Sequence, residues 1–265
     1  MSKDQTYPGV NTTTQWFAKR FRGSAMDANC GCLHTTESIN WPGYGGGATA
    51  PNMTSRPDFS KKRLIHRQHF PVDMSSRALR NLAGGVETNT LNVFQWELIG
   101  SCDPKHRKTW KSGSTTYKAG VHYIYWPEAP DWALRELAKV LLWLEREHKI
   151  PAKTPIKGRW TPYPKSYGPG GQRFSNSRWR GMYGWCGHQH VPENTHGDPG
   201  ALDFPRVLAW VRSLKTRPVA PTPVWVTAKS GDTRQEICER AKVSPYTAWR
   251  LTHGSLKVGE RIRVK

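Results

Sequence analysis

The chain has 265 residues and carries 40 Lys and Arg against 20 Asp and Glu, a formal net charge of +20. Its length allows one full-sized domain and a small second one, and no run of about 18 apolar residues exists, which excludes a membrane span. The charge favours polyanions such as an anionic cell-wall polymer or nucleic acid, or it forms a solvated basic face without a specific partner.

The start of the chain and its cysteines indicate where it is made. Residues 1–14 are polar and lack the apolar core of a signal peptide. The five cysteines are an odd number spread over a mid-sized chain, which argues against a disulfide framework. We therefore expect synthesis in a reducing cytoplasm.

Three apolar runs in the first half of the chain predict strands, at Cys30–His34, Leu64–Phe70 and Val93–Gly100. The segment Asn40–Ser60 is rich in Gly, Pro and Ser and predicts a long loop, which follows His34 closely enough to form a wall of a cleft. A second loop is expected at Ile156–Arg178, where Gly, Pro, Tyr and Arg are frequent, also at the rim.

Two segments in the second half predict helices. Apolar residues at helical spacing indicate a helix from Trp132 to His148, capped by Asp131 and ended by Lys149-Ile150-Pro151. A second helix, Phe204–Leu214, opens with Pro205 at a favoured first-turn position. Strands that alternate with helices imply an α/β layer architecture.

The C-terminal part of the chain predicts a separate small domain. Residues 213–223 are rich in Pro with small and basic residues, as in a semi-rigid linker. This linker divides a domain at residues 1–212 from one at residues 224–265. A domain of this size is small for an independent core.

Within residues 224–265 the pattern is strand, helix, helix, strand. Val224–Thr227 and Leu256–Val264 have strand patterns, Gly231-Asp232-Thr233 gives a turn and a cap for a helix over Arg234–Ala241, and Ser244-Pro245 starts another helix.

This βααβ order, with Gly231-Asp232-Thr233 and Val258–Ile262, resembles a LysM module, which implies binding to glycans that contain N-acetylglucosamine. Arg234 and Thr252-His253 depart from the usual pattern of that family. The alternative is an appendage that only adds stability, because a fold does not imply a function.

The segment Gly187–Gly200 places three imidazoles and a carboxylate close together, at His188, His190, His196 and Asp198. Two His and one carboxylate form the ligand set of a catalytic zinc site that keeps its fourth position open. His190 competes with His188 as a ligand, because neighbours two apart on an extended segment point the same way. The segment therefore suggests metal-assisted hydrolysis.

The spacing of His188 and Asp198-Pro199-Gly200, with nine residues between His and Asp, resembles the zinc site of type-2 N-acetylmuramoyl-L-alanine amidases. These enzymes share the fold of peptidoglycan recognition proteins. His34, followed by Thr-Thr-Glu-Ser, looks like the family's first ligand. Gly84–Asn89 is similar to a stretch in amidase endolysins of phages that infect actinobacteria.

The resemblance covers roughly residues 27–214 and implies a central mixed β-sheet flanked by helices. It also implies Zn2+ held by His34, His188 and Asp198. Glu97, on the strand that looks like the family's central one, is the candidate general base; a buried carboxylate is costly without a partner or a function. His196 stands where relatives commonly carry a Lys that stabilises the oxyanion.

Other residues near the motif have simpler interpretations. Cys30 and Cys32 flank Gly31 before His34, and Cys186 precedes Gly187. The cysteines can form a thiolate site or be small buried strand residues, and the second is the commoner case. The remaining histidines, including His66, His69, His106, His122, His148 and His253, are interpreted as structural or surface residues.

The resemblance implies a phage endolysin, made in the host cytoplasm, that acts on the host cell wall after release and cleaves peptidoglycan between N-acetylmuramic acid and L-alanine. Peptidoglycan and anionic cell-wall polymers are the expected partners. The alternatives are a catalytically inactive peptidoglycan-binding protein and a cytoplasmic amidase that recycles muropeptides. No nucleic-acid-binding motif is present, which disfavours a specific nucleic-acid partner.

Overall fold

A computed structural model describes residues 3–90, 92–169, 172–216, 225–227, 229–240 and 261–263. The chain divides into two compact units, Met1–Leu214 and Lys215–Lys265. Among the residues that the structure describes, no helix combines the length and the apolar character needed to cross a membrane.

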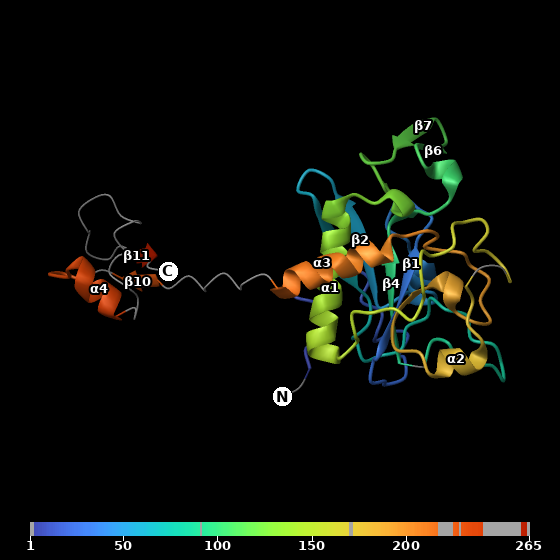
Figure 1. The fold of residues 1–265 in the computed structure, drawn as a ribbon, viewed down its shortest axis with the longest axis horizontal. Helices are drawn as coiled ribbons and strands as arrows, with labels where there is room; N and C mark the ends of the chain where they lie inside the picture. The colour runs from blue at the N-terminus through green and yellow to red at the C-terminus, as the bar shows by residue number, and fades with distance from the viewer. Residues whose placement is uncertain are drawn as a thin grey trace. The chain divides into compact units, whose positions relative to one another are not determined.

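A five-stranded sheet forms the centre of the first unit, in the order β3-β2-β4-β1-β9 (Figure 1). The strands are β1 Cys30–Thr35, β2 Met53–Asp58, β3 Arg63–Gln68, β4 Val93–Leu98 and β9 Gly184–Gly187. β1 pairs in parallel with β4 and β9, β4 pairs in parallel with β2, and the edge strand β3 is antiparallel to β2. The expected α/β fold with a central mixed sheet is confirmed.

The prediction of one long loop over Asn40–Ser60 is wrong in its second half, because β2 lies there. β2 has no apolar run, and its buried polar residues are satisfied by particular side chains. Thr54 bonds the hydroxyl of Tyr44, at 2.6 Å, and the ring of His69, at 2.9 Å. Ser55 accepts a hydrogen bond of 2.6 Å from the indole N–H of Trp96. These partners lie far enough away in sequence to leave no local pattern.

Two helices cross each other on one side of the sheet (Figure 1). They are α1, Asp131–His148, and α3, Phe204–Thr216. Asp131 does not cap α1 as expected, since Pro130 is the N-cap and Asp131 lies in the first turn. Its carboxylate instead binds Arg206 of α3, at 2.7 Å. The predicted C-terminal end is confirmed, with Lys149 in the left-handed region at φ 61°.

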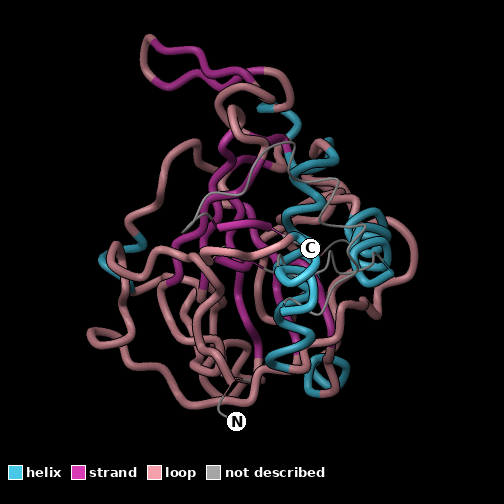
Figure 2. Tube along the Cα trace, turned by 90° about the vertical axis from the view of Figure 1, so that its left-hand side faces the viewer, coloured by secondary structure: helices cyan, strands magenta, loops and turns pink. Residues whose placement is uncertain are grey.

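The smaller elements of the first unit lie around the sheet and are joined by long loops (Figure 2). They comprise β5 Gly100–Ser101, β6 Thr109–Ser112, β7 Thr115–Lys118, β8 Ile124–Tyr125 and α2 Asn176–Arg180. There are also short 3-10 turns at Tyr44–Gly47, Pro104–His106, Trp126–Glu128 and His188–His190. β6 and β7 form a hairpin that protrudes from the body of the unit in both views.

The second unit contains a short antiparallel pair, β10 Trp225–Thr227 with β11 Arg261–Arg263, and the helix α4, Arg234–Arg240. Thr233 caps α4 as expected, because its hydroxyl accepts from the Glu236 N–H while the Glu236 carboxylate accepts from the Thr233 N–H. The helix predicted at Ser244-Pro245 lies outside the described residues.

The beginning of the predicted linker is helical. α3 continues to Thr216, so Ser213 to Thr216 belong to its last turn. The rest of residues 213–223 lies outside the described residues. Residues 215–265 form the second compact unit, so the division of the chain falls at the end of α3.

Candidate metal centre

One row of residues crosses the sheet from β1 to β3. His34 pairs with Glu97, Glu97 with Thr54, and Thr54 with Arg67. Paired residues on neighbouring strands face the same side of a sheet, so these side chains share one face. Their neighbours along the strands point the other way, as Trp96 does when it packs near His66. The sheet therefore places His34 and Glu97 side by side.

The segment after β9 brings His188 and Asp198 to the same place. His188 begins a 3-10 turn at the end of β9, and the Gln189 N–H donates to the Asp198 carbonyl at 2.9 Å. A Cβ on Gly187 would lie 2.5 Å from the Pro199 ring, so this close return of the chain requires glycine there. β9 is the neighbour of β1, which brings His188 next to His34.

The ligand atoms of His34, His188 and Asp198 converge. The two Nδ1 atoms of the histidines are 3.0 Å apart, and the Asp198 carboxylate lies 3.3 Å from Nδ1 of His188 and 3.7 Å from Nδ1 of His34. A tetrahedral metal with bonds of about 2.0–2.2 Å needs its ligand atoms roughly 3.3–3.6 Å apart. The three separations bracket that range, so this buried group can hold a metal ion.

The pKa shifts of His34 and Asp198 favour metal binding, because metal ligands must be deprotonated. Burial, followed by the charge of His188, lowers the pKa of His34 well below its usual value. Burial opposes ionisation of Asp198, but the nearby imidazoles outweigh it and the pKa of Asp198 is lowered. The backbone N–H of Thr35 also donates to Asp198, at 3.1 Å.

Asn194 orients the His188 ring, a role that no pattern in the sequence indicates. Its side-chain oxygen lies 3.0 Å from Nε2 of His188. The backbone N–H of Arg80 donates to the same oxygen at 2.9 Å, and the Asn194 amide donates to the Pro192 carbonyl. A partner of this kind on the far nitrogen of a metal-binding histidine fixes the ring and its tautomer.

Glu97 provides a second carboxyl group beside the ligands. It lines a cavity together with His188, His196 and Asp198. Its Oε2 atom is buried and has no hydrogen-bond partner among the described residues. Burial, then the charges of Asp198 and Glu37, raises the pKa of Glu97 well above its usual value. The geometry thus leaves one oxygen of Glu97 available beside the three ligands.

His196 lies on the solvent side of the group. Its side chain is 67% exposed, its ring stacks on His188 with 4.7 Å between centroids, and its Nδ1 is 3.7 Å from Asp198. Burial is the main cause that lowers the pKa of His196. His196 is therefore placed to contact a bound molecule at the mouth of the site.

His190 points away from the ligands, whereas His188 lies among them. Residues 188–190 form a 3-10 turn rather than an extended segment. The Nδ1 atom of His190 accepts from the Gly187 N–H at 2.9 Å, and its Nε2 faces Gln172. Burial lowers the pKa of His190 to about 3, so it stays neutral.

Two cavities meet at His196 and Asp198. One is lined by Tyr44, Arg77, Arg80 and Glu97, among other residues, and the other by Glu37, Trp110, Tyr163 and Tyr167, among others. Both loops expected at the rim line these cavities, the first through Tyr44 and the second through Tyr163 and Tyr167.

Glu37 borders both cavities, and it was not among the residues predicted for the site. It accepts from the Thr35 hydroxyl, from Ser101 and from the Cys102 N–H. These partners come from two separate strands, so no local pattern predicts the contact.

The cysteines near the site are buried strand residues. Cys32 lies opposite Cys186 in the pairing of β1 and β9, and both are fully buried together with Cys30. Burial raises the pKa of Cys30 and of Cys32 well above the usual value, which keeps them as thiols. The group of described residues that could hold a metal ion, His34, His188 and Asp198, contains neither cysteine.

Comparison with protein-family models, with curated proteins and with solved structures finds no match to this chain. The class of site follows from its own geometry. It is a buried group of two histidines and one carboxylate, able to hold a metal ion, on one face of a mixed sheet in an α/β fold.

Proposed function

We propose that this protein is a zinc-dependent amidase that cleaves peptidoglycan between N-acetylmuramic acid and L-alanine, and that it acts as a phage endolysin. The convergence of His34, His188 and Asp198 carries the proposal. Two nitrogen ligands and one oxygen ligand match catalytic zinc sites, which keep one position open. When bound, the metal would polarise a carbonyl oxygen and lower the pKa of a water molecule.

Glu97 and His196 supply the remaining chemistry in this proposal. The free oxygen of Glu97 can accept a proton from the attacking water and pass it to the leaving amine. The exposed ring of His196 can donate a hydrogen bond to the oxygen on which negative charge develops. Both residues line the cavity beside the ligands, and the side chain of His196 is exposed at its mouth.

The two cavities suit the two halves of such a substrate. Trp110, Tyr163 and Tyr167 offer aromatic faces on one side, as sugar rings require. Arg77 and Arg80 line the other side, where the carboxylates of a stem peptide would meet positive charge. An amide bond between a sugar acid and a peptide would then lie where the cavities meet.

The alternatives are less well supported by the residues. A binding protein without activity has no need of three converging ligands and a free carboxylate. A cytoplasmic amidase that recycles soluble muropeptides has no need of a net charge of +20 or of a second compact unit.

The experiment that tests the proposal is digestion of purified peptidoglycan by the zinc-loaded protein. New L-alanine amino termini should appear without new reducing sugar ends, and His188→Ala should release none. Release of reducing ends would indicate a glycosidase, and release of neither product by the wild-type protein would exclude the amidase function.

We also propose that the second unit is a LysM-like anchor for the wall. It carries a β-strand pair and a capped helix, and it is separate from the catalytic unit. A separate anchor raises the effective concentration of the enzyme at an insoluble substrate and leaves the chemistry unchanged.

A chain that ends after Thr216 tests this role, because α3 is then complete. It should cleave soluble muropeptides at the full-length rate and sediment less with walls, most clearly at high salt, where screening weakens the attraction of the basic first unit. Equal sedimentation of the two proteins would remove the anchoring role.

A further inference from the structure

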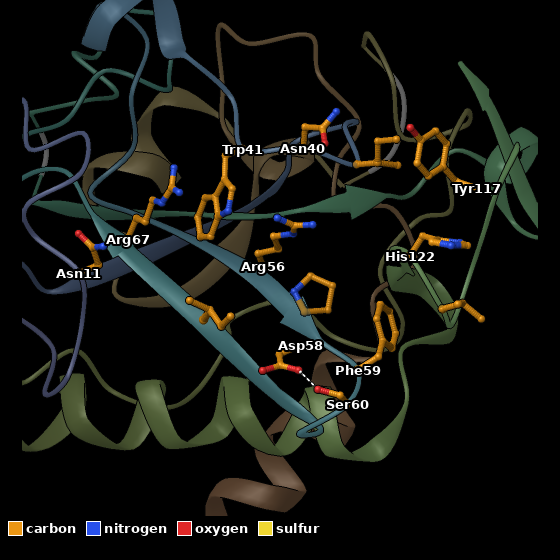
Figure 3. A pocket seen from close by; sticks show the side chains of 14 residues that line it. Asn11, Asn40, Trp41, Arg56, Asp58, Phe59, Ser60, Arg67, Tyr117 and His122 are labelled. Carbon is orange, nitrogen blue, oxygen red and sulfur yellow. Dashed lines mark hydrogen bonds between the residues drawn. The ribbon is translucent and has the colours of Figure 1, made fainter. Parts of the chain in front are cut away.

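A second groove lies on the first unit, away from the metal ligands. Its volume is about 750 Å³, within the range of ligand sites. Figure 3 shows Arg56 near its centre, with Trp41 and Arg67 on one side and Tyr117 and His122 on the other. The walls thus come from the β2–β3 hairpin, the segment after β1, and the region of the β6–β7 hairpin.

This groove occupies the same face of the sheet as the metal centre. Arg67 is the last member of the row that begins with His34, and Arg56 lies two residues beyond Thr54 on β2. Only a short segment separates the two places, since Asn40 and Trp41 line the groove while Pro42 and Tyr44 line the metal cavity. A long ligand can therefore contact both.

Two arginines in the groove have no counter-ion. In the described part of the chain, no Asp or Glu makes an ion pair with Arg56 or Arg67. Partial burial, together with the charge of Arg56, lowers the pKa of Arg67. Two positive groups held close in a concave surface attract an anion, and guanidinium groups match the geometry of phosphate and carboxylate.

Among the described residues that line the groove, Asp58 is the one acidic residue, and its carboxylate is bound by its own neighbours in the chain. It accepts from the Ser60 hydroxyl at 2.7 Å and from the Lys61 N–H at 3.1 Å. Arg63 pairs with its other oxygen, at 3.4 Å. Asp58 therefore leaves the charge of Arg56 and Arg67 uncompensated.

The groove also has aromatic and amide groups. The Arg67 guanidinium lies 4.0 Å from the Trp41 ring and donates to Gln15 at 3.1 Å, which fixes both side chains. Tyr117 packs edge-on against His122 on the opposite side of the groove from Trp41. Aromatic faces bind sugar rings, and the amides of Asn11 and Asn40 can bond hydroxyl groups.

We propose that this groove binds an acidic polysaccharide, with Arg56 and Arg67 holding its phosphate or carboxylate groups and Trp41 contacting a sugar ring. The preference for a polysaccharide over nucleic acid rests on the proposed action on cell walls. The anion-binding role of the arginines rests only on the groove itself.

Titration calorimetry with the full-length protein tests the proposal. The probes are poly(glycerol phosphate), polygalacturonate, neutral dextran and a single-stranded oligothymidylate. Poly(glycerol phosphate), polygalacturonate or both should bind, and dextran should not. Binding of the first identifies phosphate as an anion that the groove accepts, and binding of the second identifies carboxylate. Loss of two charge-assisted contacts in Arg56→Gln/Arg67→Gln should weaken binding about 10- to 100-fold.

The matched control is Arg146→Gln/Arg180→Gln, which removes the same charge at exposed positions on α1 and α2 and should retain the affinity. Arg56→Gln alone should weaken binding too. The Arg56 side chain makes no hydrogen bond or ion pair with the residues that the structure describes, so this variant tests the site if the double variant unfolds. If the control pair weakens binding equally, the loss of affinity comes from the lower net charge, and the proposal is overturned.

Tighter binding of the oligothymidylate than of either acidic polymer would also overturn it. Cleavage of soluble muropeptides should be unchanged in the Arg56 and Arg67 variants. Binding is measured without turnover, so failure of the amidase function and failure of the groove give different results.

Discussion

The metal centre and the arginine groove occupy opposite ends of one row across the sheet, and they differ in how their polar groups are satisfied. His34 and Asp198 are 1% and 6% exposed, and their polar atoms face one another. Arg56 and Arg67 are only half-buried and have no carboxylate partner in the described chain. Converging ligands suit chemistry on one atom, whereas separated charges in an open groove suit binding of an extended molecule.

Between the two regions lies a buried polar cluster. The hydroxyl of Thr54 contacts both Tyr44 and His69, and the other nitrogen of His69 contacts the Gln15 carbonyl at 2.8 Å. This cluster fixes the segment that separates the metal cavity from the groove.

The largest effect is expected from Glu97→Gln, which keeps the shape of the side chain but cannot accept a proton. Turnover should fall by about 10²-fold or more, the usual scale for loss of general acid–base catalysis. Zinc content and binding of acidic polysaccharide should stay unchanged. Glu147→Gln, on α1, is the matched control. Turnover near the wild-type rate in Glu97→Gln would assign the proton transfer to another group.

Loss of the His196 ring should have a similar or somewhat smaller effect. If the ring stabilises the oxyanion, His196→Ala lowers kcat by roughly 10²–10³-fold and leaves zinc bound. His196→Lys should recover part of the rate. His122→Ala, which removes an exposed ring from the groove, should not change cleavage of soluble muropeptides. Loss of zinc in His196→Ala would show that His196 is a ligand.

The buried position of His69 in this polar cluster predicts that the stability of the protein depends on pH. Burial lowers the pKa of His69 to about 4, against about 6.5 when unfolded. The unfolded chain therefore binds the proton more readily between pH 6.5 and pH 4, and the free energy of unfolding falls as the pH falls through that window.

Through His69, acidification lowers the free energy of unfolding by about 1 kcal/mol per pH unit in this window. Denaturant unfolding at pH 7 and pH 5 measures it, and His69→Gln should lose less stability on acidification than wild type. His122→Gln, whose ring is exposed, should behave as wild type. An identical loss in His69→Gln and wild type would contradict the burial argument.

The sequence predicted the regular parts of the fold and left out the parts fixed by distant partners. Helical spacing of apolar residues predicted α1, and apolar runs predicted the strands around Leu33 and Phe94, because both are local patterns. β2 was missed because Thr54 and Ser55 are buried by contacts with Tyr44, His69 and Trp96. Asp131 was misassigned as a cap because its partner, Arg206, lies on another helix.

In the candidate site too, local patterns were predicted and contacts between distant residues were not. The spacing of His188 and Asp198 is local and was visible, and its resemblance to an amidase motif pointed to His34 and Glu97. Glu37 and Asn194 were missed, since each acts through residues brought close only by the fold. The groove was missed for the same reason, because Trp41, Arg56 and Arg67 share no spacing that indicates a site.

The most direct test of the account is zinc stoichiometry, measured by atomic emission on protein that has been stripped with chelator, loaded with zinc and desalted. Wild-type protein should hold about one zinc ion per chain, His188→Ala should hold none, and Arg56→Gln/Arg67→Gln should hold as much as wild type. A wild-type protein that retains no zinc, or full occupancy in His188→Ala, would contradict the assignment of His34, His188 and Asp198 as the metal centre.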